Sequence, residues 1–507
     1  MISIIWSVVL AVFIVIFYRK EIRSALHYRR KLIETIDLLP GPPAIPILGC
    51  TYRFSFDLEK FTIQMNEAYR KYGLIGSGVA RMWIGPFPFV FLCRADSMKA
   101  VFEDTTLVNK PIQYEIMREL TGDGLLVSNS DKWHQRRRLI SPAFHFNVLK
   151  SYTDIFNKHA RELCEILLPH CEDGKTFDLL PLMKRSMLDI ITETALGQST
   201  ECLFGKNKDY CDAVCKTHHL MLKYLKSPWL WVPFIRRVCG HKMKMDKHLA
   251  ITKALRAEMI ERRLKELEEA ERNPASREKM LHQKGTVFLD TLIDLWKEGQ
   301  LSMTDVQDEV DTFMLAGHDS TAVTTALTLF ALGHHQDYQN KCYEEICAVT
   351  GGEDRDITYE DTINLKYVGQ CHKESMRLWT PIMIFARIAQ KELKIGEFTI
   401  PANTPLCIIP TASHHDPEQF PNPDQYNPDN FSPENVSKRN PFAFVPFSAG
   451  IRNCIGQKFA YTEGRVQLAA ILRRYKIFSM VSEEENLLIP SITGKPKYGV
   501  PIRIEPR

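Results

Sequence analysis

Residues 446–456 contain the cysteine whose neighbours point most directly to chemistry. They read Pro-Phe-Ser-Ala-Gly-Ile-Arg-Asn-Cys-Ile-Gly, so Cys454 follows Arg452 by two residues and lies between Gly450 and Gly456. A buried cysteine is most often an inert small apolar residue, but glycines allow unusual dihedral angles and close approach to a flat ligand. An apolar helix is expected directly after this loop, and a helix N-terminus stabilises a thiolate. Such a thiolate predicts an iron ligand of the kind found in cysteine-ligated haem, where it favours cleavage of a bound O–O bond.

A second polar group lies in the middle of a long apolar helical pattern over about residues 303–334. Asp319, Ser320 and Thr321 closely follow Gly317. Acids and hydroxyls are costly to bury without partners, and glycine weakens a helix. The combination indicates a functional groove; the alternative is that the hydroxyls bond to carbonyls of their own helix.

Several charged and aromatic residues have spacings that suit support or anion binding. Glu374 and Arg377 are three apart on an expected helix and are predicted to form a charge-assisted hydrogen bond. Trp133 and Arg137 are four apart on an arginine-rich helix, and Arg387 follows an apolar segment. Guanidinium groups match carboxylates in geometry. The alternative for the arginine run is an exposed basic face, to which Arg136 and Arg138 are assigned.

Two weaker patterns are interpreted as structural. The pair His414-His415, followed by Asp416, resembles a metal site only superficially, since adjacent histidines point in different directions in most backbones. Cys211 and Cys215 would share one helix face and are interpreted as buried thiols rather than a metal pair.

The composition limits the class of protein. The chain has 507 residues, 65 basic and 61 acidic, and a formal charge of +4, which gives no global field to recruit nucleic acid. Thirteen cysteines without paired short spacings make a poor disulfide framework and favour a reduced, cytosol-facing body. No Gly-rich dinucleotide fingerprint follows an expected strand.

The elements that must position these residues are mostly helical. Helical periodicity is expected over about 59–72, 132–169, 176–196, 243–272, 303–334 and 457–474, with short strands near 80–91 and 393–409. Residues 1–18 are uncharged and are predicted to be a transmembrane signal-anchor, because basic residues follow them. The expected organisation is this anchor, a basic and proline-rich linker over 19–46, and a single domain over 47–507.

The cysteine loop, the acid and hydroxyl pair and the Glu374/Arg377 pair together resemble motifs of the cytochrome P-450 superfamily, in the family's order. Four further segments are most like its family 4: Asp131-Lys132-Trp133, Ser141-Pro142-Ala143-Phe144-His145-Phe146, Phe288-Leu289-Asp290 and Val310-Asp311-Thr312-Phe313-Met314. The resemblance implies a mainly α fold with a small β-rich part, and haem b held by Cys454. Two departures stand out. Ser320 occupies the place of the usual threonine, and Asn430 that of an arginine which normally joins the glutamate–arginine pair.

The resemblance also assigns the remaining site residues. Asp319 and Ser320, with Thr321, would relay protons, and Glu374 and Arg377 would support the core behind the cysteine loop. The haem contacts would be Trp133, Arg137, Arg387, Phe447, Gly450, Arg452 and Gly456, and those with the propionates would be made by Trp133, Arg137, Arg387 and Arg452. The pocket walls would be Leu315, Ala316, Ile382, Ile384 and Ile492. Many family 4 members have a glutamate at the position of Ala316 that bonds covalently to haem, so here haem is expected to be non-covalently held.

The implied activity is a monooxygenase reaction, R–H + O₂ + two electrons + two protons giving R–OH + H₂O, with fatty acids or eicosanoids hydroxylated at or near the ω carbon. Electrons would come from NADPH through cytochrome P-450 reductase, with cytochrome b5 as a second candidate donor. The implied location is the endoplasmic reticulum membrane, with one span and the catalytic domain in the cytosol. Two alternatives stay open: a haem-thiolate isomerase that needs no reductase, and a non-enzymatic haem-binding or sensor protein.

Overall fold

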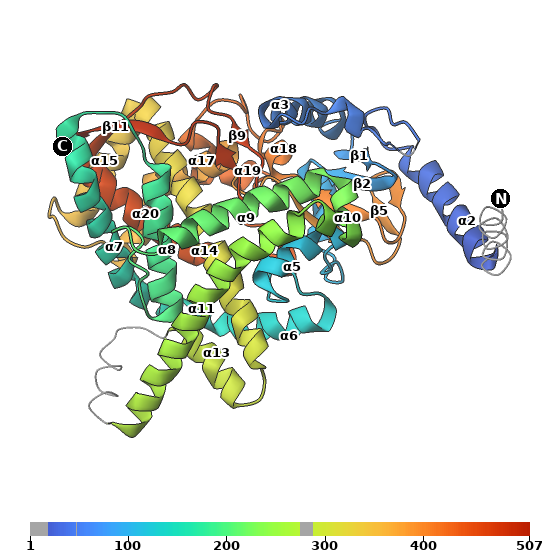
Figure 1. Cartoon of the computed structure of the whole chain (residues 1–507). Helices are drawn as coiled ribbons and strands as arrows, with labels where there is room; N and C mark the ends of the chain where they lie inside the picture. The colour runs from blue at the N-terminus through green and yellow to red at the C-terminus, as the bar shows by residue number, and fades with distance from the viewer. Residues whose placement is uncertain (1–18, 47, 274–286) are drawn as a thin grey trace.

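Helix α14 (Met303–His334) lies at the centre of the molecule, and most other helices pack around it (Figure 1). The computed structural model describes residues 19–46, 48–273 and 287–507. Within these residues α14 contacts α8 (Leu180–Leu196), α17 (Lys366–Leu378) and α20 (Gln457–Arg474), which are the elements nearest the candidate site.

The remaining helices complete the helical part of the fold. In chain order they are α2 (Arg19–Ile36), α3 (Leu58–Ala68), α4 (Ala95–Phe102), α5 (Glu115–Thr121), α6 (Ser130–Ile140), α7 (Phe146–Asp173), α9 (Lys208–Lys226), α10 (Pro233–Val238), α11 (His241–Arg272), α13 (Phe288–Lys297), α15 (Gln336–Thr350), α16 (Tyr359–Asn364), α18 (Pro410–His414) and α19 (Pro433–Lys438). The short helical turns are η1 (Thr51–Arg53), η2 (Tyr69–Gly73), η3 (Ile112–Tyr114), η4 (Ser141–Phe144), η5 (Pro228–Trp231), η6 (Pro428–Phe431) and η7 (Gly450–Arg452).

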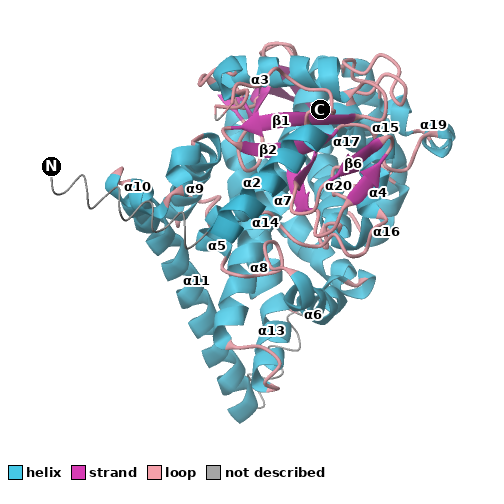
Figure 2. Cartoon of the chain, turned by 90° about the vertical axis from the view of Figure 1, so that its right-hand side faces the viewer, coloured by secondary structure: helices cyan, strands magenta, loops and turns pink. Residues whose placement is uncertain are grey.

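The strands form small sheets (Figure 2). The largest has the order β1-β2-β7-β4, from β1 (Val79–Ile84), β2 (Phe87–Leu92), β7 (Pro405–Ile408) and β4 (Phe385–Ile388). Within this sheet β2 and β7 pair in parallel, with Phe91 opposite Cys407. A second sheet has the order β3-β11-β8, from β3 (Phe177–Asp178), β11 (Pro501–Pro506) and β8 (Tyr475–Ser479). The hairpins are β5 (Leu393–Ile395) with β6 (Phe398–Ile400), and β9 (Leu488–Ile489) with β10 (Lys495–Pro496).

Local sequence explains where α14 begins and why it is central. Ser302 and Asp305 form a capping box in which each side chain accepts a hydrogen bond from the other's backbone N–H. From Val306 to Gly333 almost every residue is buried, so the helix is apolar on all sides rather than on one stripe. A helix of this kind is stable only when other elements surround it.

The expected helices are confirmed to different degrees. Those over 303–334 and 457–474 match α14 and α20, and 243–272 matches α11 closely. The single helix expected over 132–169 is wrong: α6 ends at Ile140, the turn η4 contains Pro142, and α7 starts at Phe146. Proline cannot donate a backbone hydrogen bond, so it ends the first helix. The helix expected from 176 starts at Leu180, because β3 precedes it. The strands near 80–91 and 393–409 are confirmed, and Pro88 lies within β2.

The structure of residues 19–46 differs from the linker that the sequence predicts, because the first part of this segment is a helix. Residues Arg19–Ile36 form α2, which projects from the body in Figure 1, while Leu32 and Ile36 in its last two turns are buried in an apolar cluster with β1 and β2. The expected anchor over residues 1–18 lies outside the described residues. Among the helices that the structure does describe, none is both long and apolar enough to cross a membrane.

Candidate functional site

The cysteine loop brings Cys454 to the start of α20. The Cys454 N–H donates to the Phe447 carbonyl at 2.8 Å, which closes the loop, and the Phe447 ring packs edge-on against Tyr461 at 5.0 Å between centroids. Gly450 has φ +67°, and a Cβ atom there would lie 2.2 Å from the Phe102 carbonyl oxygen, so glycine is required. Gly456 has an ordinary φ of −87°. The expectation of unusual dihedrals is therefore confirmed for Gly450 and wrong for Gly456.

The Cys454 side chain lies within the body of the protein, but its surface is accessible to solvent. Burial raises the pKa of its thiol, while the Gly456 N–H and Arg137 act in the opposite direction. The Gly456 N–H at the start of α20 thus favours the thiolate, as expected, but burial outweighs it and the net pKa is raised. A metal ion deprotonates a coordinating thiol outright. The site thus holds an accessible thiol whose ionisation depends on a ligand.

A cluster of cations, of which Arg387 is buried and the others half-buried, lies beside this loop. Arg452 donates to the carbonyls of Leu126, at 3.1 Å, and Ser128, and its Nε is buried without a partner. Arg387 is 3% exposed and donates to Ala386 O at 3.0 Å. Burial lowers the pKa of both guanidinium groups, that of Arg452 to about 9, with mutual repulsion as a further cause for Arg452.

Lys110 and Tyr114 complete this cation cluster, and sequence analysis missed both. Burial, Arg387 and Arg452 lower the pKa of Lys110 well below its usual value, and its ammonium lies over the Tyr114 ring at 4.5 Å. Tyr114 accepts a hydrogen bond from Ala386 N at 3.0 Å. No carboxylate among residues 19–46, 48–273 and 287–507 neutralises Lys110, Arg387 or Arg452. Only their packing reveals this group, since Lys110 belongs to no motif.

Helix α6 supplies residues with three different roles. The Trp133 ring is 3% exposed and lies 4.7 Å from the Arg452 guanidinium, which fixes both side chains. Arg137 donates to Asn453 O at 2.8 Å and to Asn453 Oδ1 at 2.7 Å, so it fastens the cysteine loop and keeps fewer donors for an anion. Arg136 is buried and pairs with Asp305 of α14, so its assignment to an exposed basic face was wrong. Arg138 is exposed, as expected.

The acid of the central helix is paired rather than free. Asp319 is 3% exposed, and its Oδ1 lies 2.6 Å from Lys184 Nζ of α8. Burial alone would raise the pKa of Asp319, but Lys184, His218 and His318 together hold it well below its usual range. Burial lowers the pKa of His218 to about 4, so this histidine is neutral near pH 7. Asp319 and Lys184 therefore form one buried ion pair between α14 and α8.

The two hydroxyls next to Asp319 bond to their own helix. Ser320 Oγ donates to Ala316 O at 3.1 Å, and Thr321 Oγ1 donates to Gly317 O at 3.2 Å, which is the alternative left open above. Each oxygen keeps lone pairs that can accept a proton or a hydrogen bond. Gly317 does not interrupt α14: a Cβ atom there would lie 2.5 Å from Ile191, so the glycine lets α8 pack closely.

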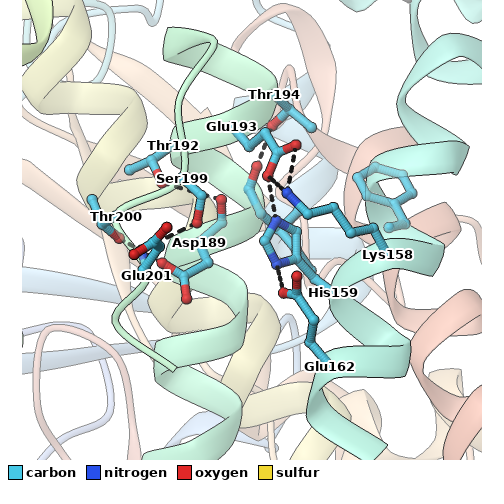
Figure 3. Close-up of polar contacts among 12 residues, drawn as sticks. Lys158, His159, Glu162, Asp189, Thr192, Glu193, Thr194, Ser199, Thr200 and Glu201 are labelled. Atoms are coloured by element: carbon cyan, nitrogen blue, oxygen red, sulfur yellow. Dashed lines mark hydrogen bonds and ion pairs between the residues drawn. The ribbon is translucent and has the colours of Figure 1, made fainter. Parts of the chain in front are cut away.

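Helix α8 is held in turn by a buried polar cluster with α7 (Figure 3). His159 is 1% exposed, and its ring nitrogens lie 2.7 Å from Glu162 Oε2 and 2.8 Å from Glu193 Oε2. Lys158 also pairs with Glu193 at 2.7 Å. Burial lowers the pKa of His159, but the two carboxylates outweigh it and raise the net value. This charged contact fixes the helix that carries Lys184.

The glutamate–arginine pair behind the loop is confirmed. Both side chains are fully buried, with Arg377 Nη2 2.7 Å from Glu374 Oε1 and Nε 2.8 Å from Oε2. Asn430 Nδ2 donates to Glu374 Oε1 at 3.1 Å, so the third contact exists without a charge. Arg439 donates to Asn430 O at 2.6 Å and lies 4.0 Å from the Phe420 ring centroid. The cation that is missing at position 430 is therefore supplied by Arg439, which contacts Asn430 rather than Glu374.

The expected pocket walls divide into two groups. Ala316 is exposed within an otherwise buried helix, and Ile384 is 47% exposed, so both line open space. Ile382 and Ile492 are half-buried, whereas Leu315 is 7% exposed and belongs to the main core. The side chain at position 316 is therefore a methyl group facing open space, and no carboxylate is present at this position.

The weaker metal patterns are structural. His414 ends α18 and accepts a hydrogen bond from Val445 N at 3.0 Å, while His415 bonds to Thr411 O. Cys215 is exposed and Cys211 half-buried, so the prediction of two buried thiols was wrong. In the part of the chain that the structure describes, no three His, Cys, Asp or Glu side chains come together to hold a metal ion.

Comparison with known proteins assigns the family. The family model "Cytochrome P450" matches residues 39–500. The chain belongs to the cytochrome P450 family. Family 4 members are similar to this cytochrome P450 along most of its length. "Cytochrome P450 4c3" of Drosophila melanogaster is 32% identical over 94% of this chain and 91% of its own length, and human "Cytochrome P450 4V2" is 33% identical over 95% and 92%. The solved haem domain of cytochrome P450DA superposes with a TM-score of 0.76 at 22% identity, covering 92% of this chain and 98% of that one.

The family implies haem b with a cysteine thiolate ligand, and the residues of this cytochrome P450 fit that group. An accessible thiol at the start of α20 can supply the ligand, and Arg387, Arg452 and Lys110 lack the counter-charges that two propionates would provide. Burying unpaired cations is costly, so the arrangement makes physical sense only with an anionic ligand. The family also makes the protein a haem monooxygenase and an oxidoreductase.

Proposed function

We propose that this cytochrome P450 hydroxylates fatty acids or eicosanoids at or near the ω carbon. The observation that carries the proposal is the accessible Cys454 thiol beside three buried or half-buried cations without carboxylate partners among the described residues. The apolar side chains of Ala316, Ile384, Ile382 and Ile492 suit a hydrocarbon tail. The likeness to family 4 supports the same substrate class.

Each site residue then has a defined task. Cys454 would hold the haem iron, and Arg387, Arg452 and Lys110 would hold the propionates, with Trp133 packed against Arg452. Cysteine-ligated haem supplies electron donation that favours cleavage of a bound O–O bond. Asp319, kept ionised by Lys184, and the Ser320 hydroxyl would together relay protons into the space beside Ala316. Thr321 is one position further round the helix and has no separate task.

Electrons come from NADPH through a separate reductase, with cytochrome b5 as a second donor, because the sequence has no dinucleotide-binding fingerprint. The enzyme is proposed to be anchored in the endoplasmic reticulum membrane through residues 1–18, with its catalytic domain in the cytosol. The domain boundary at residue 47 belongs to the same proposal.

The test combines binding and turnover. The full-length protein is titrated with fatty acids of increasing chain length while the haem absorption band is followed, and binders are then incubated with reductase, NADPH and O₂. We expect a spectral shift and NADPH-dependent hydroxylated products near the ω end. Conversion of a fatty-acid peroxide without NADPH would favour the isomerase alternative, and a spectral shift without any product would favour a sensor.

A further inference from the structure

Cys202 and Cys211 form a pair of interacting thiols where the chain passes from α8 to α9. Both are free cysteines in the structure. Cys202 is buried in the loop between the two helices, and Cys211 is half-buried in the first turn of α9. A hydrogen bond joins the two thiols. The pair is therefore distinct from the loop that carries Cys454.

The loop that carries Cys202 is fixed from α8 by Asp189, which lies next to Thr200 in Figure 3. Asp189 Oδ1 accepts hydrogen bonds from Thr200 Oγ1 at 2.6 Å and from Cys202 N at 2.8 Å, and its Oδ2 accepts from Leu203 N at 2.8 Å. Cys202 Sγ lies 3.5 Å from the carbonyl oxygen of Asn207, the residue directly before α9. These contacts hold the Cys202 sulfur beside the start of α9.

The two thiols differ in acidity. The hydrogen bond from Cys211 lowers the pKa of Cys202; burial and Asp189 act in the opposite direction, while Thr200 and Arg185 add to the lowering. The same hydrogen bond, together with burial, raises the pKa of Cys211. When the pair loses one proton, the negative charge therefore resides on Cys202 and the remaining proton on Cys211. The thiolate is the nucleophilic form of cysteine.

The turn that connects the two cysteines lies at the protein surface. Phe204 is 54% exposed, and residues 206–209 are also exposed. Gly205 and residues 207–210 line one side of a surface pocket of about 460 Å³, whose other side is formed by α11. Solvent and small solutes thus reach the segment around the pair. An acidic thiol with a second thiol beside it and a path to solvent is typical of a redox-sensitive cysteine pair.

A second close pair of thiols shows that proximity alone does not give these properties. Cys342 Sγ of α15 lies 3.5 Å from Cys371 Sγ of α17. Both residues are fully buried, and the hydrogen bond to Cys371 and burial raise the pKa of Cys342 well above its usual value. This pair lacks both an acidic member and a path to solvent, so it serves as an internal control.

We propose that Cys202 and Cys211 are a modification site for hydrogen peroxide, which oxidises the two thiols to a disulfide. The Cys202 thiolate attacks one peroxide oxygen and becomes a sulfenic acid, while the O–O bond breaks and the departing hydroxide takes up the proton that Cys202 lost on ionisation. The Cys211 sulfur then attacks the Cys202 sulfur; the S–S bond forms, the S–O bond breaks, and the oxygen leaves as water with the Cys211 proton. Two thiols are oxidised and one peroxide is reduced to two waters.

The new bond would join the loop after α8 to the first turn of α9. These helices supply Lys184 and His218, which lie 2.6 Å and 3.6 Å from the carboxylate of Asp319. Small thiols would reverse the modification by thiol–disulfide exchange. The proposal does not depend on the substrate, so its failure leaves the proposed function untouched.

Peptide mapping of the full-length, haem-loaded protein tests the proposal. The protein is treated with a few equivalents of hydrogen peroxide, the reaction is stopped with catalase, and free thiols are alkylated before digestion without reductant. Trypsin cleaves after Lys206 and Lys208, so a disulfide would link the peptide that ends at Lys206 to the peptide 209–216. Fragmentation of the linked species distinguishes Cys211 from Cys215 within the second peptide.

We expect the Cys202–Cys211 disulfide to form at least roughly ten times faster than one between Cys342 and Cys371, because one pKa unit changes the thiolate fraction about tenfold. Dithiothreitol should restore both thiols. Recovery of Cys202 and Cys211 as thiols under conditions that oxidise the exposed Cys215, or equal rates for the two pairs, would overturn the proposal.

Single variants assign the role of each sulfur. Cys211→Ser keeps a hydroxyl that can donate to Cys202, so oxidation should stop at a Cys202 sulfenic acid, which dimedone traps. Cys202→Ser should abolish the disulfide and leave Cys211 as a thiol. The matched control Cys215→Ser removes the neighbouring exposed thiol and should leave the disulfide unchanged. A bond from Cys211 to Cys215 in the unaltered chain, or absence of dimedone labelling in Cys211→Ser, would overturn the assignment of Cys202 as the reacting thiolate.

Discussion

Glu309 and Arg452 hold the same residue from opposite sides. Leu125 N donates to Glu309 Oε2 at 3.0 Å, while Leu125 O lies 3.4 Å from Arg452 Nη1. Glu309 is fully buried, its Oε1 has no hydrogen-bond partner, and Arg136 Nη1 lies 3.6 Å away. This carboxyl group and a guanidinium group proposed to hold haem therefore contact the same peptide residue.

The first prediction concerns the charge of Glu309. Burial raises its pKa from 4.5 to about 7, so the folded protein binds a proton that the unfolded chain releases between these values. Stability from this group is present below pH 4.5 and falls as the pH rises to 7, by about 3 kcal/mol in total. Glu309→Gln keeps an acceptor for Leu125 and cannot ionise. Its stability relative to the parent, from thermal unfolding of the haem-loaded protein, should therefore rise over this interval; a constant difference would contradict the assigned pKa.

The second prediction concerns the ligand. Cys454→Ser should abolish the absorption band characteristic of thiolate ligation in the reduced carbon monoxide complex, because serine lacks the electron donation of the thiolate. Cys347→Ser is the control and should keep the band. A variant at position 454 that retained it would remove Cys454 as the ligand.

The third prediction concerns proton delivery. Asp319→Asn removes the acid and leaves Lys184 without its counter-charge, so product formed per NADPH consumed should fall on the order of tenfold, with hydrogen peroxide released instead. Ser320→Ala should have the same direction of effect with little change in stability. Thr324→Ala is the matched control, since Thr324 also donates only to its own helix, at 2.9 Å to Ser320 O. Unchanged coupling in both site variants would leave these residues with a structural role alone.

The fourth prediction concerns the contact between α7 and α8. The pKa of His159 is raised above 6.5, so its stabilising effect is complete below pH 6.5 and disappears as the pH rises through the raised value. His159→Gln should thus lower the midpoint of thermal unfolding most near pH 6 and least at alkaline pH, with a cost of about 1.5–3 kcal/mol at the acid end. Lys158→Gln breaks the second contact to Glu193 and should show no pH dependence in this window. Equal losses for His159→Gln at pH 6 and pH 9 would be inconsistent with a charged imidazole.

The fifth prediction concerns the missing carboxylate at position 316. A methyl group cannot form an ester, so acidified organic solvent should extract unmodified haem from the protein, and fatty-acid products should be a mixture of ω and near-ω alcohols. Ala316→Glu should acquire haem attachment that depends on turnover. Mass spectrometry of the polypeptide after extraction measures haem attachment in the unaltered chain and in the Ala316→Glu variant. Haem retained on the unaltered chain would show a different covalent link, and exclusively terminal hydroxylation would show that positioning does not need the tether.

Sequence periodicity predicted the elements that are buried on all sides or bounded by clear signals, such as α14 and α20. It failed where a single proline divides a continuous pattern, because the apolar spacing of 132–169 runs through the turn that contains Pro142. It also could not place α2: its basic residues suggested a linker, whereas Ile36 is fully buried against β-strand residues far along the chain. A truncation after residue 36 would therefore remove part of the core as well as the expected anchor.

For the site, the spacing of residues within one segment allowed predictions. Contacts between segments that are far apart in the sequence could not be predicted from it. The loop around Cys454 and the pair Glu374/Arg377 could be predicted because all their members are neighbours in sequence. The partners Lys184 of Asp319 and Arg439 of Asn430 come from other elements and leave no local signal. Lys110 was missed for the same reason: its role follows from its distance to two arginines that tertiary packing brings together.

The unneutralised charges of Lys110, Arg387 and Arg452 bear on how much of the protein a cell can maintain. Until an anionic cofactor arrives, the chain folds against the repulsion among these groups, and the segment around Leu125 that Arg452 holds is part of that strained neighbourhood. Newly made chains without cofactor will spend more time open, where proteases and chaperones act. We therefore expect haem supply, as well as synthesis, to affect how much of the protein accumulates.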